Sequence, residues 1–306
     1  MRRALGILVL LGLAGALGFF VLTIPRGLPA AELATLPEGD AARGETWFWA
    51  GGCGSCHAAE RAKGDDKFQL GGGLVLATEF GDFVAPNISP HPEDGIGNWN
   101  AAEFANAMKR GISPDGRHYY PAFPYASYTR MDLTDVADLW AFLQTLPPVE
   151  GRAPDNDLRF PYNIRRGLGL WKLAFLDDAP VVEIDTADPV LVRGRYLVEG
   201  AGHCAECHSP RNFGGAMDTD LWLAGAPAAD GPGRIPNITP GEGGIGDWSQ
   251  ADLAYYFETG FTPEFDTVGS TMVSVQDNLS RLDATDRTAI AAYLAAVPAH
   301  DTATAP

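Results

Sequence analysis

The sequence predicts an all-α chain in which two helical domains of the same kind follow a single apolar helix. Three observations support this fold class. An uncharged run of 21 residues extends from Ala4 to Ile24. Sequence landmarks within residues 40–149 recur within residues 189–299 at a nearly constant spacing. Within both repeated segments, residue types that commonly cap the start of a helix are followed by apolar residues three or four positions apart, the spacing of one helix face.

Residues 1–27 are predicted to be a membrane anchor or a signal segment. A run of 21 apolar residues is long enough to cross a bilayer as a helix. Arg2 and Arg3 precede it, which favours a cytoplasmic N-terminus and export of the remaining chain. A cleaved signal peptide is the alternative, but its apolar core usually has about 7–15 residues. In either case we expect the domains to lie outside the cytoplasm.

Four landmarks define an internal repeat. Their spacing lies between 149 and 151 residues: 86–90 returns as 236–240 (Pro-Asn-Ile-Ser/Thr-Pro), 95–99 as 244–248, 111–114 as 260–263, and 134–135 as 285–286. A repeat of this length indicates a duplicated domain and not a solenoid unit. Residues 40–149 are called the first repeat below, residues 189–299 the second repeat, and residues 150–188 the connector.

Each repeat is predicted to contain three main helices separated by long loops. The first helices are expected at 41–50, with Asp40 as N-cap, and at 189–198. The middle helices should begin at capping-box patterns, Asn100-x-x-Glu103 and Ser249-x-x-Asp252, and end before a glycine at 111 and 260. The last helices are expected at 134–143 and 285–294.

The connector has an apolar middle, residues 168–176, between ends rich in Pro, Gly and charge. We expect its central turns to pack on one or both domains, because Trp171 and Phe175 would otherwise form an exposed apolar patch. A hairpin that touches the membrane is the alternative.

Two pentapeptides indicate the chemistry. Cys-Gly-Ser-Cys-His occupies 53–57 and Cys-Ala-Glu-Cys-His occupies 204–208, and together they use all 4 cysteines. C-x-x-C-H is the signature of covalent haem attachment, in which both thiols add to the haem and the His binds iron. We therefore expect two class I cytochrome c domains and two covalently bound haem c groups. Their attachment residues would be Cys53, Cys56, Cys204 and Cys207, with His57 and His208 as iron ligands.

Zinc is the competing interpretation of these motifs, because C-x-x-C pairs also bind zinc. A four-thiolate zinc site would make the His after each pair incidental, and two such coincidences argue against it. A thioredoxin-type redox pair would lie in a βαβ context, which the sequence does not show.

The sixth iron ligands are predicted to differ between the two haems. Met272 lies between the middle and last helices of the second repeat, where a loop can cross the distal face. A Met ligand raises the haem potential. Met217 follows His208 by only nine residues, so its loop would have to fold back sharply. In the first repeat we expect His118, the strongest ligand in the corresponding loop.

Three other residues of the first repeat fit an iron less well. Met131 aligns with Leu282 just before the last helix, a position that favours packing, and Met108 lies inside the middle helix. His91, like His118, lies in a loop, where a lone His is usually solvated, so this alternative stays open for both. An iron with no sixth ligand at all is the remaining alternative for this haem.

The formal net charge is −17, and it becomes −19 when Arg2 and Arg3 are left out. Such a charge supports solubility and can steer the protein toward a positively charged redox partner. It argues against nucleic acid as a partner, because binding to phosphates requires cationic side chains.

Several stretches resemble a known family. Residues 85–90, 95–99, 111–125 and the last helix of the first repeat are similar to the multi-haem cytochrome c subunits of periplasmic dehydrogenases. The likeness is greatest to the cytochrome subunits of membrane-bound alcohol dehydrogenases and of related molybdenum-hydroxylase complexes. Those alcohol dehydrogenase subunits usually offer Met where this chain has Phe123, and they commonly carry three haem domains where this chain shows two.

The resemblance implies a periplasmic dehydrogenase as electron donor and a quinone, cytochrome or oxidase as acceptor. Together with the N-terminal apolar run, it predicts a protein at the bacterial cytoplasmic membrane, held by the N-terminal helix, with the haem domains in the periplasm. We expect an electron-transfer subunit and not a stand-alone enzyme. A di-haem enzyme of the peroxidase type is the alternative, and it would need an open sixth site on the first haem.

Overall fold

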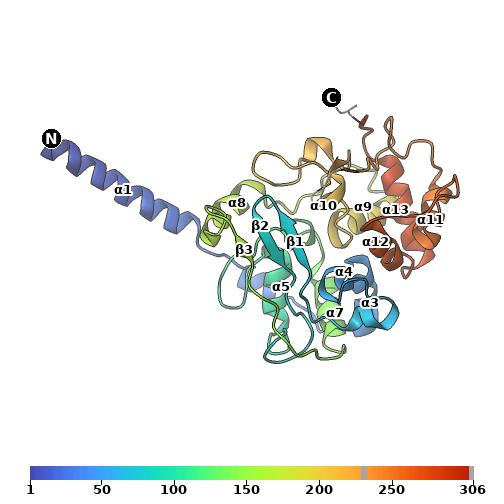
Figure 1. The fold of residues 1–306 in the computed structure, drawn as a ribbon, viewed down its shortest axis with the longest axis horizontal. Helices are drawn as coiled ribbons and strands as arrows, with labels where there is room; N and C mark the ends of the chain where they lie inside the picture. The colour runs from blue at the N-terminus through green and yellow to red at the C-terminus, as the bar shows by residue number, and fades with distance from the viewer. Residues whose placement is uncertain (229–232, 303–306) are drawn as a thin grey trace.

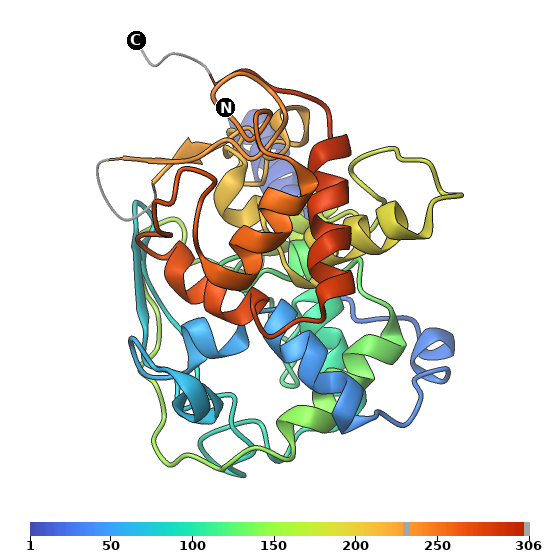
Figure 2. The ribbon, with the colours of Figure 1, turned by 90° about the vertical axis from the view of Figure 1, so that its right-hand side faces the viewer.

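The computed structural model describes residues 1–228 and 233–302 of the chain. The first helix, α1 (Arg2–Leu22), projects from a body in which the two repeats lie side by side (Figures 1 and 2). Among the described residues, α1 is the one helix long and apolar enough to cross a membrane, and none of it is buried in the body. A short helix, α2 (Ala30–Leu33), leads into the first repeat.

The two repeats contain corresponding helices. The helix before each haem motif packs on the last helix of its repeat, α3 on α7 and α9 on α13. The first repeat comprises α3 (Ala41–Ala50), α4 (Cys53–His57), η1 (Gly64–Phe68), α5 (Ala101–Arg110), α6 (Tyr125–Tyr128) and α7 (Leu133–Leu143). The second comprises α9 (Pro189–Tyr196), the π-helical turn η3 (Leu197–Ala201), α10 (Ala205–His208), η4 (Thr219–Leu221), α11 (Gln250–Thr259), α12 (Met272–Leu279) and α13 (Ala284–Ala296).

The predicted helix ends are confirmed by their capping contacts. The Asp40 carboxylate accepts hydrogen bonds from the backbone N–H groups of Ala42 and Arg43 at the start of α3. Both predicted capping boxes form, at the starts of α5 and α11. Gly111 and Gly260 end these helices with φ of 58° and 79°, a conformation that favours glycine.

One glycine in each repeat allows the first and last helices to cross closely. A Cβ atom added at Gly44 would lie 2.0 Å from the carbonyl oxygen of Asp138 on α7. A Cβ atom at Gly194 would lie 2.0 Å from the carbonyl oxygen of Ala289 on α13. No side chain fits at such distances, so both crossings require glycine.

The expectation of an all-α chain is correct only in part. Two small sheets interrupt the loops. Strands β1 (Val75–Thr78) and β2 (Gly81–Val84) form an antiparallel hairpin, and β3 (Asp157–Leu158) of the connector pairs with β2. In the second repeat β4 (Ala226–Pro227) pairs with β5 (Arg234–Ile235). These strands have two to four residues, too few to give a clear alternating pattern.

The connector contacts both repeats, as predicted. It contains η2 (Arg165–Gly167) and α8 (Leu168–Phe175). The Trp171 indole N–H donates to the carbonyl of Gly214 in the second repeat, at 2.9 Å. Lys172 Nζ donates to the carbonyls of Arg110 and Gly111 in the first repeat, at 2.6 and 2.7 Å. The connector therefore bridges the two repeats and is not an isolated loop.

Candidate functional site

The first haem motif forms the short helix α4, directly after α3. Gly52 between them has φ of 59°, which lets the chain turn from one helix into the other. His57 Nδ1 lies 2.8 Å from the carbonyl oxygen of Pro86. With the proton on Nδ1, this hydrogen bond fixes the imidazole plane and leaves Nε2 to bind an iron.

The second motif repeats this arrangement. His208 Nδ1 lies 2.8 Å from the carbonyl oxygen of Pro236. Burial lowers the pKa of both His57 and His208, so the neutral ring that a metal requires is favoured. Two imidazoles 151 residues apart are therefore held by the same contact with a proline carbonyl.

The loops that carry Pro86 and Pro236 are held by the asparagine that follows each proline. Asn87 Oδ1 accepts from the Ser89 N–H at 2.9 Å, and its amide donates to the Val149 carbonyl at 2.8 Å. Asn237 makes the corresponding contacts with Thr239 and with the chain that follows α13. The need to hold the proline carbonyl in place explains why Pro-Asn-Ile-Ser/Thr-Pro occurs in both repeats. The sequence shows that the motif is repeated, but it does not show that the proline carbonyl contacts the His.

The cysteines complete a donor set that fits covalent haem c. Burial raises the pKa of Cys53 and of Cys204 to about 12, so the apolar surroundings favour the neutral thiols. Burial, and then the charge of Cys207, raise the pKa of Cys56. Each motif thus offers two thiols for thioether bonds and one oriented imidazole for iron. Among the described residues no group of three or more His, Cys, Asp or Glu forms a metal site of the zinc type.

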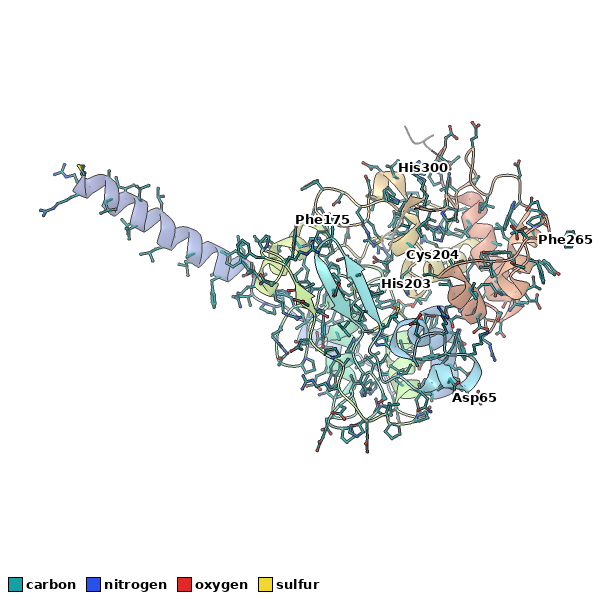
Figure 3. The ribbon with its side chains drawn as sticks, viewed as in Figure 1. Asp65, Phe175, His203, Cys204, Phe265 and His300 are labelled. Carbon is teal, nitrogen blue, oxygen red and sulfur yellow. The ribbon has the colours of Figure 1, made fainter. Side chains whose placement is uncertain are left out.

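The two motifs lie next to each other at the contact between the repeats. His203, the residue before the second motif, places Nε2 3.1 Å from the carbonyl oxygen of Gly51, two residues before the first. Its ring also contacts the ring of Tyr128 edge to face, with centroids 5.6 Å apart. Figure 3 shows His203 and Cys204 between the two repeats.

Each motif also faces the helix that precedes the last helix of the other repeat. Ser55 Oγ in the first motif lies 2.8 Å from Ser274 Oγ on α12, and Asn278 of α12 donates to Ser55 Oγ at 2.8 Å. Glu206 in the second motif lies 3.5 Å from Ser127 Oγ on α6. The surroundings of each motif are therefore completed by the other repeat.

Met272, the expected sixth ligand of the second haem, is the first residue of α12. It is half-buried and packs against the apolar core, as does Met217. No contact in the structure tests its ligation of iron, which stays a prediction.

The corresponding position of the first repeat is Phe123, 149 residues before Met272. Its ring contacts the rings of Tyr119, Tyr125 and Tyr128, with centroids 5.8, 6.3 and 5.7 Å apart. Tyr128 lies close enough to the first motif that Cys53 and Cys56 add to burial in raising its pKa. The distal loop of the first repeat therefore places aromatic rings where the second repeat has a thioether.

His118 does not join this aromatic group. It is 4% exposed, and its Nε2 lies 3.0 Å from the carbonyl oxygen of Thr23 at the end of α1. Adjacent side chains of an extended segment point to opposite faces. Tyr119 points toward Phe123, whereas the Tyr120 hydroxyl donates to the Tyr162 carbonyl of the connector. The structure thus brings His118 to α1, away from the expected distal position, although its ligation of iron is not itself tested.

The three other candidates of the first repeat make packing or local contacts. Met131 is buried, and its carbonyl accepts a hydrogen bond from Lys109, as the Leu282 carbonyl does from Arg287. Met108 is buried in the core of the first repeat. His91 Nδ1 accepts from the Asp94 N–H at 3.0 Å, which is a local loop contact.

Comparison with known proteins gives a consistent result. The family model of cytochrome c matches residues 41–147. The diheme cytochrome c-type protein of Cereibacter sphaeroides is 51% identical over 300 residues, which cover 98% of this chain and 99% of that protein. The fructose dehydrogenase cytochrome subunit of Gluconobacter japonicus is 39% identical over 84% of this chain. The cytochrome c subunit of alcohol dehydrogenase (quinone) of Gluconobacter oxydans is 31% identical over 94% of this chain. The matches cover 52% and 60% of the latter two proteins.

Proposed function

The chain belongs to the cytochrome c family, and from this we propose that it is a di-haem electron-transfer subunit at the outer face of the bacterial cytoplasmic membrane. One observation carries the proposal. Each C-x-x-C-H motif has its His fixed by a proline carbonyl at 2.8 Å, in two repeats of one chain. Such a contact orients an imidazole for axial ligation and has no role in a four-thiolate zinc site.

Two tandem class I cytochrome c domains follow, at residues 40–149 and 189–299, joined by the connector at 150–188. The matching helix caps, the glycine at each helix crossing and the Asn-fixed proline loop support this division. Each domain holds one haem c through its two cysteines, and the name of the Cereibacter relative supports the number of two.

The haems supply reversible one-electron transfer at iron, and this chain's residues bind, orient and shield them. His57 and His208 would each hold one haem iron, and Met272 would be the further ligand of the second iron. For the first haem, ligation by His118 would require its ring to leave the Thr23 carbonyl. A haem without a thioether ligand would have the lower potential, so electrons would enter through the first domain and leave through the second.

The partners follow from the chemistry and from the relatives. The Gluconobacter proteins are named as cytochrome subunits of fructose dehydrogenase and of alcohol dehydrogenase (quinone). By analogy, a periplasmic dehydrogenase donates electrons to this chain, and a quinone, cytochrome or oxidase accepts them. The adjacent motifs support rapid transfer between the two haems, because His203 and Gly51 join the two attachment segments directly.

Purification of the native protein from membranes tests the proposal. We expect two covalent haems per chain, a co-purifying dehydrogenase subunit, and reduction of both haems when the substrate of that dehydrogenase is added. A chain that carries zinc, or no haem, would refute the assignment. Haems that stay oxidised in the presence of an active co-purified dehydrogenase would refute the proposed direction of transfer.

Phe123 favours one alternative function, a di-haem enzyme of the peroxidase type. The Phe123 side chain has no donor atom and cannot ligate iron, so the first haem could offer an open site. The spin state of this haem separates the two functions. A six-coordinate low-spin haem indicates a carrier, and a high-spin haem that turns over peroxide indicates an enzyme.

A further inference from the structure

The C-terminal end of α1 is built into the body of the protein. Thr23 is completely buried, and its carbonyl contacts His118. The Arg166 guanidinium donates to Thr23 Oγ1 at 3.0 Å and to the Phe20 carbonyl at 2.8 Å, and it lies over the Phe20 ring. The last carbonyls of a helix normally lack partners, and a cation there is favourable. These contacts therefore stabilise the point where α1 meets the body.

The connector packs directly against this point. A Cβ atom added at Gly169 on α8 would lie 2.5 Å from Thr23 Cα, so the two backbones touch. Five residues further along, the Leu28 N–H donates to the Asn106 side chain of α5 at 2.7 Å. The chain on both sides of residue 23 is thus held, and α1 leaves the body in a defined direction beside α8 (Figure 1).

The connector segment that contacts this exit carries several exposed apolar side chains. We call them the connector surface: Phe160, Tyr162, Ile164, Leu170 and Leu173. Phe160 is 78% exposed and Leu173 is 63% exposed. Large apolar side chains gathered in this way usually mark a surface that another phase or molecule covers.

The charge of the same segment is opposite to that of the whole protein. Residues 158–176 contain Arg159, Arg165, Arg166 and Lys172 and no Asp or Glu, although Asp157 and Asp177 flank them and the chain carries a net charge of −17. Arg159 is exposed, whereas the other three cations are half-buried and donate hydrogen bonds to the body or to the end of α1. Apolar side chains interspersed with Arg and Lys are typical of segments that lie in the headgroup region of anionic membranes. An acidic soluble partner would match the cations but would not require the exposed aliphatic residues.

We propose that the connector surface lies in the headgroup region of the outer leaflet, beside α1, and fixes the orientation of the haem domains relative to the membrane. The dimensions agree. The 21 residues of α1 span about 31 Å as a helix, close to the ~30 Å hydrocarbon core, so the connector lies at the level of the outer headgroups. This inference rests on the proposed retention of α1 as an anchor.

Site-specific labelling of the full-length, haem-loaded protein tests the inference. All four native cysteines are then in thioethers, so Leu173→Cys introduces a single thiol on the connector surface. Phe265→Cys is the matched control, because Phe265 is 83% exposed and lies on the side of the body opposite to Phe175 and α1 (Figure 3). Each variant is placed in vesicles of phosphatidylethanolamine and phosphatidylglycerol and treated with a membrane-impermeant maleimide.

We expect Leu173→Cys to react about tenfold more slowly than Phe265→Cys, because a thiol in the headgroup region is shielded from a reagent that stays in water. Adding Ile164→Ser and Leu170→Ser to the Leu173→Cys chain should restore most of the reactivity. Both substituted side chains are exposed, so the fold should tolerate them. Alkaline carbonate should leave all variants in the membrane.

Three results would overturn the inference. Equal reactivity of the two thiols in carbonate-resistant protein would show that α1 anchors the chain but the connector surface stays in water. Protection that appears only when a purified dehydrogenase is added would assign the surface to a protein partner. A soluble chain whose N-terminus has been cleaved after α1 would refute the anchor, and N-terminal sequencing distinguishes this result from the other two.

Discussion

Lys67 offers a sensitive test of how the two repeats are joined. Its side chain is only 2% exposed, although it belongs to a charged turn of the first repeat. Its ammonium donates to Asn278 Oδ1 at 2.6 Å and lies 2.6 Å from the Asp277 carboxylate, both on α12 of the second repeat. A buried cation costs free energy unless such partners surround it.

The expected cost of removing one partner follows from these contacts. Asn278→Leu keeps the volume but removes the bond to the ammonium and the bond to Ser55 Oγ. A hydrogen bond to a charged group contributes about 1.5–3 kcal/mol and a neutral one about 0.5–1.5 kcal/mol, so we expect a loss of about 2–4 kcal/mol. For a chain of this size the loss should lower the Tm by roughly 5–12 °C.

A double variant serves as the control. Lys67→Met in the Asn278→Leu background removes the cation together with its partner, and it should recover most of the lost stability. Thermal unfolding of the haem-loaded protein, followed by circular dichroism and by haem absorbance, measures both effects. If Asn278→Leu keeps the wild-type Tm, or if the double variant is no more stable than the single one, Lys67 does not join the repeats as described.

Four further predictions concern the haems and the connector. Replacing Cys204 and Cys207 by Ala should remove one haem of two, as measured by pyridine haemochrome spectra and intact mass; loss of both would contradict independent loading. Met272→Ala should abolish the near-infrared thioether-to-iron band and lower the potential of the second haem, and a surviving band would exclude Met272. His118→Ala should give a high-spin first haem that binds carbon monoxide if His118 ligates iron, whereas an unchanged low-spin spectrum excludes it. Burial lowers the pKa of Lys172 from 10.5 to about 7, so between these pH values the unfolded chain holds a proton that the folded protein has lost. Stability relative to Lys172→Met should therefore rise with pH across this window and stay level below it, where both states are protonated; a difference that is flat across the window would contradict the shift.

The sequence predicts the helices well because their ends depend on local contacts. The Asp40 carboxylate caps α3 by accepting a hydrogen bond from the N–H two residues later, and Gly111 ends α5 directly after its last residue. The contact between His57 and Pro86 spans 29 residues and depends on how a whole loop folds. The repeat marks Pro86 as a recurring position, but only the structure shows that its carbonyl oxygen is the partner of His57.

The ligand prediction for His118 was limited for a related reason. In the sequence, His118 is the strongest ligand of its loop, and nothing local says which way its side chain points. Its environment is set by Thr23, 95 residues earlier, and by Arg165 of the connector, whose guanidinium donates to the His118 carbonyl. Both contacts exist only once α1 and the connector have packed on the first repeat.

The contacts between the two repeats make each haem motif dependent on the other repeat. The buried ammonium of Lys67 is paired by Asp277 and Asn278 on α12 of the second repeat, and α12 begins with Met272, the proposed ligand of the second haem. A shift of α12 would therefore disturb the first motif at Ser55 and the second iron at Met272 together. In the other direction, the second motif contacts the first repeat, because Glu206 lies against Ser127 on α6. Each motif therefore contacts side chains of the other repeat, so a change in one repeat is felt at the motif of the other.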